Sequence, residues 1–351
     1  MKLNFRVTSI ILGAVLLAGG LVTTLDSPSA ASAPPALLLN AAGATFPYPI
    51  YSKWFTEYNR LHPDIQINYQ SIGSGGGIRQ LQAGTVDFGA TDMPLEDKML
   101  ADFKVKVLHF PTVLGAVVPM YNIQGVSQEL NFPAETLADI FLGKVTKWND
   151  PSLVAANKGV NLPNSDIVVV HRAEGSGTSF VWTDFLSKVS KEWETKVGKN
   201  TSVNWPVGLG GKGSEGLSGL VQQTPGAIGY VELTYAIQNK MTYGRVKNSS
   251  GAFVKADLAS VTAAAAAESK KIPEDFRVSI TNPAGKAAYP ICSFTYLLIP
   301  SKFDDPAKKQ AVKDFLNWML TEGQNSAESL SYAKLPKEIV TREMKAIAQI
   351  N

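Results

Sequence analysis

The sequence predicts an α/β protein made of two compact units. Its 351 residues exceed the usual size of one domain and fit about two. Short apolar or β-branched runs alternate with glycine- and serine-rich turns and with segments of helical spacing, which is typical of α/β folds. Two longer runs, 112–121 and 289–300, lack charged residues, and we interpret them as strands that pass between the two units.

The N-terminal half contains two predicted units of strand, turn and helix. Their strands, turns and helices fall at residues 36–40, 43–46 and 51–58, and at residues 65–72, 73–77 and 78–83. A third unit begins with a strand at 167–171, continues through a turn at 172–179, and enters a helix that contains Phe180 and Phe185. The remaining predictions are a helix at 136–141, a glycine loop at 208–216 with a helix at 217–223, a strand at 227–232, a plain surface helix at 256–269 and an amphipathic helix at 308–321.

Composition excludes several classes of protein. With 45% hydrophobic and 18% charged residues, the chain is neither disordered, nor collagen-like, nor a multi-span membrane protein. The net charge of +3 is too small an excess to indicate a nucleic-acid or membrane partner. A specific anion must therefore be held by a local site.

Cysteine and histidine give no sign of a metal or redox centre. Cys292 is the only cysteine, so no internal disulfide forms, and its apolar surroundings predict a buried, inert thiol. The three histidines, His62, His109 and His171, are scattered and lack the spacing of metal ligands, so we interpret each as structural or solvated. The sequence thus predicts neither a cofactor nor a metal.

The N-terminus has the three parts of a secretory signal peptide. Lys2 and Arg6 precede an uncharged apolar run, and the small residues Ala31-Ser32-Ala33 form a cleavage site that assigns residues 1–33 to the signal. A membrane anchor is the alternative, because the apolar run is about long enough to span a bilayer. No cysteine follows the run, so we do not expect a lipoprotein. The predicted location is the periplasm.

The three strand-to-helix turns are candidate anion sites. A helix N-terminus offers unpaired N–H groups and the positive end of the helix dipole, and serine or threonine adds a hydroxyl donor. Thr45, Ser74 and Ser176 occupy such turns. Each of them is also an ordinary helix-capping residue when taken alone. Three such turns in one chain could converge on a single oxyanion.

Arg172 and Asp92 make the combination more specific. Arg172 directly precedes the third turn and is placed to bind a tetrahedral anion with its guanidinium, while a salt bridge to Glu174 or Asp184 is the alternative. Asp92 ends a strand-like run near the glycine-rich turns.

A carboxylate beside an anion is unfavourable unless the ligand brings a proton to share, as phosphate does at neutral pH and sulfate does not. Asp92 would then act as a selectivity filter. A plain turn cap before Pro94 is the alternative role, and Asp87 is the competing acid.

Other phosphate and catalytic motifs fail. Residues 208–213 spell G-x-G-x-x-G, but Trp205-Pro206 stands where the preceding strand of a dinucleotide-binding fold belongs. Lys212 is not followed by serine or threonine, which excludes a P-loop. No G-x-S-x-G motif is present.

An ordered set of motifs resembles the periplasmic phosphate-binding proteins of bacterial phosphate ABC transporters, the PstS family. The resemblance extends from about Leu39 to the C-terminal helices. Its motifs lie at residues 43–47, 72–77, 87–92, 142–144, 147–150, 172–180, 208–213 and 226–231. In better-known members an aspartate stands at the position of Glu174.

The resemblance implies a two-lobed type II periplasmic binding fold with two crossover hinge strands, and phosphate bound between the lobes. It implies lobe I at 34–115 plus 290–351 and lobe II at 116–289. Phosphate would be bound by Thr45, Phe46, Ser74, Asp92, Arg172, Ser176, Gly177 and Thr178, with Glu174 supporting the arginine.

The implied function is high-affinity capture of inorganic phosphate and its delivery to the membrane permease subunits of a phosphate ABC transporter. We expect a monomeric solute-binding protein, not an enzyme, with no nucleic-acid partner. Two alternatives stay open: a binder of another, sulfate-like oxyanion, and a secreted phosphatase that uses the same cradle.

Overall fold

The computed structural model describes residues 36–351, so the predicted signal peptide at 1–33 lies outside the described residues. Within residues 36–351, no helix combines the length and apolar character needed to cross a membrane. One sheet in the order β2-β1-β3-β12-β4-β8-β6-β7 organises the fold, with β9 paired to β4. A smaller sheet has the order β11-β10-β5.

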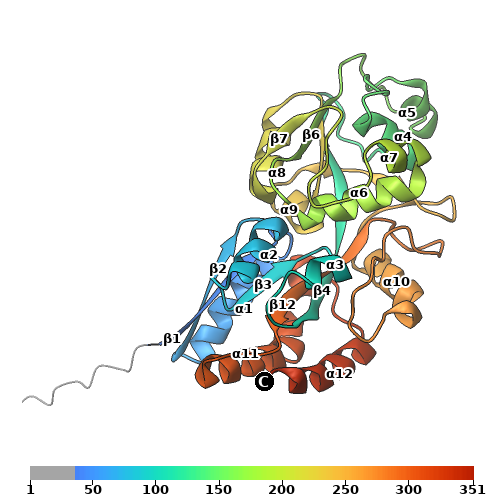
Figure 1. Cartoon of the computed structure of the whole chain (residues 1–351). Coiled ribbons are helices and arrows are strands. Elements are labelled where there is room, and N and C mark those ends of the chain that lie inside the picture. Colours follow the sequence, from blue (N-terminus) through green and yellow to red (C-terminus); the bar gives the residue numbers. More distant parts are fainter. Residues whose placement is uncertain (1–35) are drawn as a thin grey trace, which may run out of the picture. The chain divides into compact units, whose positions relative to one another are not determined.

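The first lobe contains the N-terminal and C-terminal elements (Figure 1). Its strands are β1 (Leu37–Gly43), β2 (Ile65–Ser71), β3 (Phe88–Thr91), the first part of β4 (Val107–Asn122) and β12 (Cys292–Pro300). Its helices are α1 (Tyr48–Leu61), α2 (Ser74–Ala83), α3 (Asp97–Leu100), α11 (Pro306–Leu320) and α12 (Lys337–Ala346), with short 3₁₀ turns η2 (Gly323–Ser326), η3 (Glu328–Leu330) and η4 (Ile347–Gln349).

The second lobe is formed by the middle of the chain (Figure 1). Its strands are the second part of β4, β5 (Asn131–Phe132), β6 (Val168–Arg172), β7 (Leu209–Gly211), β8 (Ala227–Glu232), β9 (Thr242–Tyr243), β10 (Arg245–Lys247) and β11 (Phe253–Val254). Its helices are α4 (Ala134–Phe141), α5 (Pro151–Ala156), α6 (Gly177–Val189), α7 (Lys191–Lys196), α8 (Gly213–Gln223) and α9 (Leu233–Gln238).

Strand β4 belongs to both lobes. Residues 107–116 pair antiparallel with β12, and residues 117–122 pair antiparallel with β8, so the partner changes between Ala116 and Val117. The strand is buried almost throughout, as its uninterrupted apolar sequence predicts for a central strand. The predicted strands at 112–121 and 289–300 correspond to β4 and β12, although each differs by a few residues at its ends. Strand β4 passes between the lobes as predicted, whereas β12 pairs only with β3 and the first part of β4 and lies in the first lobe.

Two predictions for the second half need adjustment. The glycine loop at 208–216 contains the short strand β7, which pairs parallel with β6 through Leu209 and Val170. Glycine disfavours β-strands, so the glycine-rich sequence gives no sign of β7. The strand forms because it pairs with the neighbouring strand β6.

The predicted surface helix is α10 (Leu258–Glu268), followed by the 3₁₀ turn η1 (Ser269–Lys271). Val261, Ala264 and Ala265 are buried, and the helix packs against β4 and β12. Figure 1 shows it in the lobe that contains α12. One face of α10 therefore belongs to the hydrophobic core, so α10 is not the plain surface helix that the sequence predicted.

Cys292 and His109 are buried, as expected for residues with a structural role. Cys292 is fully buried, and burial raises the pKa of its thiol. His109 accepts the Leu95 N–H at 3.2 Å, and burial lowers its pKa to about 3. Within the described part of the chain, no three histidine, cysteine, aspartate or glutamate side chains form a group that could hold a metal ion.

Candidate functional site

The site lies at strand-to-helix turns of both lobes. In the first lobe, Thr45 follows β1 and Ser74 is the first residue of α2, which follows β2. In the second lobe, Ser176 caps α6, which follows β6. Because β1 and β2 run parallel, their carboxyl ends meet at one edge of the sheet. The turns of Ser74 and Ser176 meet between the lobes, where Ser74 bonds Gly177 and Gly75 bonds Gly175.

The side chains predicted from the sequence are buried there. Seven of them have relative exposures of at most 3%: Thr45, Phe46, Ser74, Asp92, Arg172, Ser176 and Thr178. Polar groups so enclosed need partners, which makes their remaining hydrogen-bonding capacity informative.

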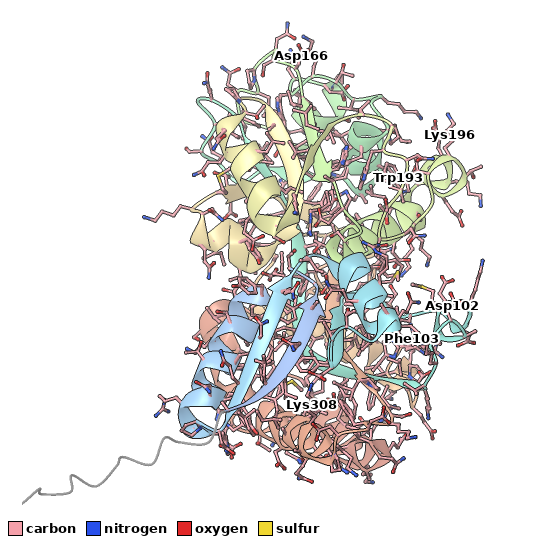
Figure 2. All side chains as sticks on the ribbon, turned by 60° about the vertical axis from the view of Figure 1, so that its left-hand side comes forward. Asp102, Phe103, Asp166, Trp193, Lys196 and Lys308 are labelled. Atoms are coloured by element: carbon pink, nitrogen blue, oxygen red, sulfur yellow. The ribbon has the colours of Figure 1, made fainter. Side chains whose placement is uncertain are left out.

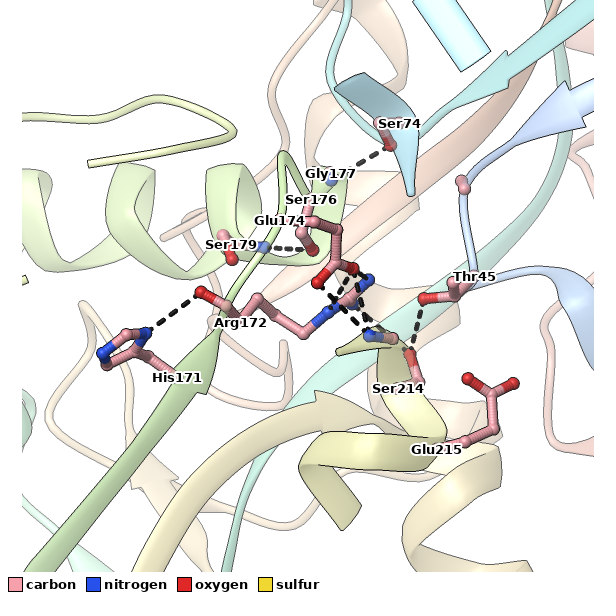
Figure 3. Close-up of polar contacts among 12 residues, drawn as sticks. Thr45, Ser74, His171, Arg172, Glu174, Ser176, Gly177, Ser179, Ser214 and Glu215 are labelled. Atoms are coloured by element: carbon pink, nitrogen blue, oxygen red, sulfur yellow. Dashed lines mark hydrogen bonds and ion pairs between the residues drawn. The ribbon is translucent and has the colours of Figure 1, made fainter. Parts of the chain in front are cut away.

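Ser74 and Gly177 join the two lobes. The Ser74 hydroxyl oxygen accepts the N–H of Gly177 at 3.0 Å (Figure 3). It also accepts the N–H of Asp92 at 3.3 Å. A β-carbon at residue 177 would lie 2.4 Å from Ser74 Oγ and 2.5 Å from Asp92 Oδ2. Glycine is therefore required at the start of α6 while the lobes are together. A second bond, from the Gly75 N–H to the Gly175 carbonyl at 2.9 Å, also crosses between them.

Within residues 36–351, one carboxylate oxygen of Asp92 makes a hydrogen bond and the other makes none. Its Oδ1 accepts the Thr295 hydroxyl at 2.8 Å, whereas its Oδ2 is buried and makes no hydrogen bond within the described residues. Burial raises the pKa of Asp92 to about 7, although the Thr295 bond and the nearby Arg172 oppose the rise. The carboxyl group can thus accept or share a proton near neutral pH.

Neither alternative reading for this acid fits the geometry. Asp87 accepts the Asn40 N–H at 2.8 Å and pairs with Lys308 at 2.9 Å. Figure 2 shows Lys308 at the end of the first lobe that faces away from the second. Asp92, in turn, bonds Thr295 on the neighbouring strand β12, which is distant only in sequence, and does not cap the turn before Pro94.

Arg172 is held by a glutamate from its own turn. Its guanidinium forms an ion pair with Glu174, with Nε 2.8 Å from Oε1, and the arginine side chain is almost wholly buried. Glu174 also accepts the Gly213 N–H at 3.2 Å, which ties the start of α8 to the same group. Asp184, the other predicted partner, pairs with Lys188 and Lys199 instead.

The start of α6 supplies further donors. Ser176 Oγ accepts the Ser179 N–H at 3.1 Å, so its hydroxyl hydrogen stays free to donate. Thr178 Oγ1 is buried and makes no hydrogen bond within the described residues. Thr178 and Asp92 therefore each present a buried polar atom with free hydrogen-bonding capacity beside the start of α6.

Sequence reasoning missed residues that act on Thr45. Ser214 Oγ lies 2.8 Å from Thr45 Oγ1 and 3.5 Å from Arg172 Nη1 (Figure 3). Its signal was available, because Ser214 follows the glycine loop at the start of α8 and so occupies a fourth turn of the same kind.

Tyrosine hydroxyls fix the backbone of the first turn. Tyr69 donates to the Ala44 carbonyl at 2.7 Å and Tyr235 to the Thr45 carbonyl at 2.6 Å. A planar peptide points its N–H opposite its carbonyl, so these bonds also fix the directions of the Thr45 and Phe46 N–H groups. No local pattern in the sequence announces these tyrosines.

Comparison with known proteins gives one consistent result. Residues 28–322 match the PBP superfamily domain. The chain is 44% identical over 315 residues to the phosphate-binding protein PstS of Xylella fastidiosa strain Temecula1, covering 90% of this chain and 86% of the relative. It is 37% identical over 348 residues to the PstS protein of Methanocaldococcus jannaschii, covering 93% and 89%.

Solved structures agree in fold. A high-affinity periplasmic phosphate-binding protein, PfluDING, bound with phosphate, matches with a TM-score of 0.70 at 20% identity, over 88% of this chain and 93% of that one. A phosphate-binding protein from Stenotrophomonas maltophilia matches with a TM-score of 0.65 at 19% identity, over 88% and 94%. The fold is therefore the two-lobed type II periplasmic binding fold predicted from the sequence.

Proposed function

The chain belongs to the PBP superfamily and, within it, to the PstS phosphate-binding proteins, and on this basis we propose that it binds inorganic phosphate between its lobes for uptake by an ABC transporter. It is a solute-binding protein, not an enzyme. The observation that carries the proposal is the buried, unbonded Oδ2 of Asp92 among donors from both lobes.

We assign the donors that the family resemblance implies. The N–H groups of Thr45 and Phe46, together with the Ser74 hydroxyl, would hold phosphate from the first lobe. Arg172, Ser176 and Thr178 would hold it from the second lobe, with Glu174 orienting the arginine. Gly177 is the remaining implied donor, and its N–H donates to Ser74 in this closed arrangement. The many uncharged donors stabilise a dianion in a site closed to water.

Asp92 would select for an anion that carries a proton. In the ionised form of Asp92 its free oxygen can only accept, so it needs a hydrogen on the anion, which phosphate carries at neutral pH and sulfate does not. A site built to pair with such an O–H can reject an analogue that lacks it by about 10⁴- to 10⁵-fold. This selectivity disfavours a sulfate-like ligand. The phosphatase alternative is not favoured either, because the relatives are named as binding proteins.

The partner and location follow the family. The permease subunits of a phosphate ABC transporter would receive the ligand from this protein in the periplasm. We further propose that residues 1–33 direct secretion, that the mature protein carries no lipid and is a monomer, and that nucleic acid is not a partner.

The predicted lobes are 34–115 plus 290–351, and 116–289. We propose one change to this division, which moves residues 258–268 to the first lobe, because α10 packs against β4 and β12. The change of β4 pairing between Ala116 and Val117 supports a hinge at that point.

Titration calorimetry on the purified mature chain tests the function. We expect saturable, one-to-one binding of phosphate and no heat with sulfate at the same concentrations. Equal affinity for the two anions would contradict the role of Asp92, and no binding of phosphate would contradict the proposal as a whole.

A further inference from the structure

Thr45 makes hydrogen bonds to two residues of the opposite lobe. Ser214 on α8 reaches its hydroxyl at 2.8 Å, and Tyr235 on α9 donates to its carbonyl at 2.6 Å. Ser214 has no exposed surface and Tyr235 has 4%. Thr45 belongs to the first lobe and both partners to the second, so the two bonds exist only while the lobes are together.

The Ser214 hydroxyl contacts both Arg172 and Thr45. Arginine can only donate, so the Arg172 Nη1 group donates to Ser214 Oγ. Either hydroxyl of Ser214 and Thr45 can donate to the other, and the arrangement in which Ser214 donates leaves the Thr45 hydrogen for a third group. Consecutive hydrogen bonds of this kind polarise and strengthen one another. In that arrangement the Thr45 hydroxyl is presented as a donor to an anion.

The Tyr235 contact acts on the backbone. Its bond to the Thr45 carbonyl fixes the peptide plane shared by Thr45 and Phe46, and with it the direction of the Phe46 N–H. Glu215, also on α8, lies 3.1 Å from the same hydroxyl. Because Glu215 and Tyr235 share a lobe, the hydroxyl keeps an acceptor when Thr45 moves away.

We propose that Ser214 and Tyr235 are positioning residues that form a clamp on Thr45 when the lobes close, and that this clamp slows the release of phosphate. The inference rests on the proposed phosphate binding. Neither residue needs to touch the ligand, since each acts through a donor of Thr45 or Phe46. Closure of the lobes would then also orient the donor groups of Thr45 and Phe46.

Binding kinetics of phosphate test the clamp in the full mature chain. We expect Ser214→Ala and Tyr235→Phe each to weaken binding about 10-fold, the effect of removing one partner of a buried hydrogen bond. The loss should lie in the dissociation rate, with the association rate unchanged. Thermal unfolding of Ser214→Ala without phosphate should not change, because the open protein lacks the clamp. Tyr235→Phe also loses the bond to Glu215 within the second lobe, so its unfolding temperature without phosphate measures that bond alone.

Ser218→Ala is the matched control for helix α8. Ser218 is buried one turn after Ser214, and its hydroxyl makes no hydrogen bond within the described residues. This variant should bind and release phosphate as the wild type does.

A double-mutant cycle with Thr45→Val separates positioning from a general structural role. Without the Thr45 hydroxyl, Ser214→Ala should change affinity less than about 2-fold. An equal effect of Ser214→Ala in both backgrounds, or wild-type dissociation rates in both single variants, would overturn the clamp. Failure of the wild type to bind phosphate would instead overturn the proposed function.

Discussion

The Ser74 hydroxyl in the first lobe accepts the N–H of Gly177 in the second at 3.0 Å. This bond brings the start of α6 against the start of α2, beside the unbonded oxygen of Asp92. Two helix N-termini so close together favour an anion between them. We therefore expect the distance between the two helix N-termini to affect both closure and affinity.

Gly177→Ala should prevent this approach. The added methyl group would lie 2.4 Å from Ser74 Oγ and 2.5 Å from Asp92 Oδ2, and such overpacking costs about 1–3 kcal/mol. We expect phosphate affinity, measured by calorimetry, to fall about 10-fold or more while the protein stays folded. Gly219→Ala on α8 is the control, because no atom lies within 4 Å of its added methyl group. Wild-type affinity in Gly177→Ala would contradict the closed geometry.

Asp92→Asn should reduce the preference for phosphate over sulfate. The amide offers a donor where the carboxyl group shares a proton, so an unprotonated oxyanion is no longer rejected. Competition of sulfate against phosphate gives the ratio of the two affinities. Asp87→Asn loses the Lys308 ion pair but should keep this ratio, since Asp87 lies away from the site. An unchanged ratio in Asp92→Asn would count against the filter.

Asp184 should support stability in acid. The side chain is fully buried, and its partners are Lys188, Lys199 and the hydroxyls of Ser279 and Thr281. Burial alone would raise the pKa of Asp184, but these partners outweigh burial and lower it to about 2.

Because this pKa lies below the value of 3.8 for an unfolded chain, the stabilisation is present above about pH 4 and is lost as the pH falls towards 2. Asp184→Ala should lower the free energy of unfolding by about 2 kcal/mol at pH 7, because it removes the acceptor of the buried Thr281 hydroxyl and the partner of two partly exposed lysines, Lys188 and Lys199. Urea unfolding between pH 2 and 7 measures this difference, which should shrink in acid. Asp166→Ala breaks an exposed pair with Lys147 and should change stability by less than about 1 kcal/mol. An equally small effect of Asp184→Ala would refute the prediction.

Glu343→Leu on α12 should stabilise the protein. Both carboxyl oxygens of Glu343 are buried without a hydrogen bond within the described residues, and burial raises its pKa well above the ordinary value despite the nearby Arg342. The folded protein therefore keeps a proton that the unfolded chain releases above about pH 4.5, so wild-type stability falls as the pH rises.

Leucine removes this penalty, and we expect a gain of about 1–3 kcal/mol at pH 7 that grows towards pH 8. Thermal unfolding across this pH range is the measurement. Glu338→Leu, at an exposed position of the same helix, should show no such dependence on pH. A loss of stability in Glu343→Leu would contradict the prediction.

The sequence alone determined the α/β class, the strand-to-helix turns and the positions of their polar residues. These features depend on local stereochemistry, because glycine permits tight turns, serine caps helices and uninterrupted apolar runs form central strands. The helix at 48–61 and the strands β2 and β8 could therefore be found without knowledge of their neighbours.

Only the tertiary structure decided which distant groups meet. Thr295 bonds Asp92 across 203 positions of sequence, and Ser214 bonds Thr45 across 169. Glycine-rich β7 and the buried face of α10 likewise depend on the strands packed beside them. Such contacts follow from how two lobes fold back on one another, and no local preference of the chain encodes them.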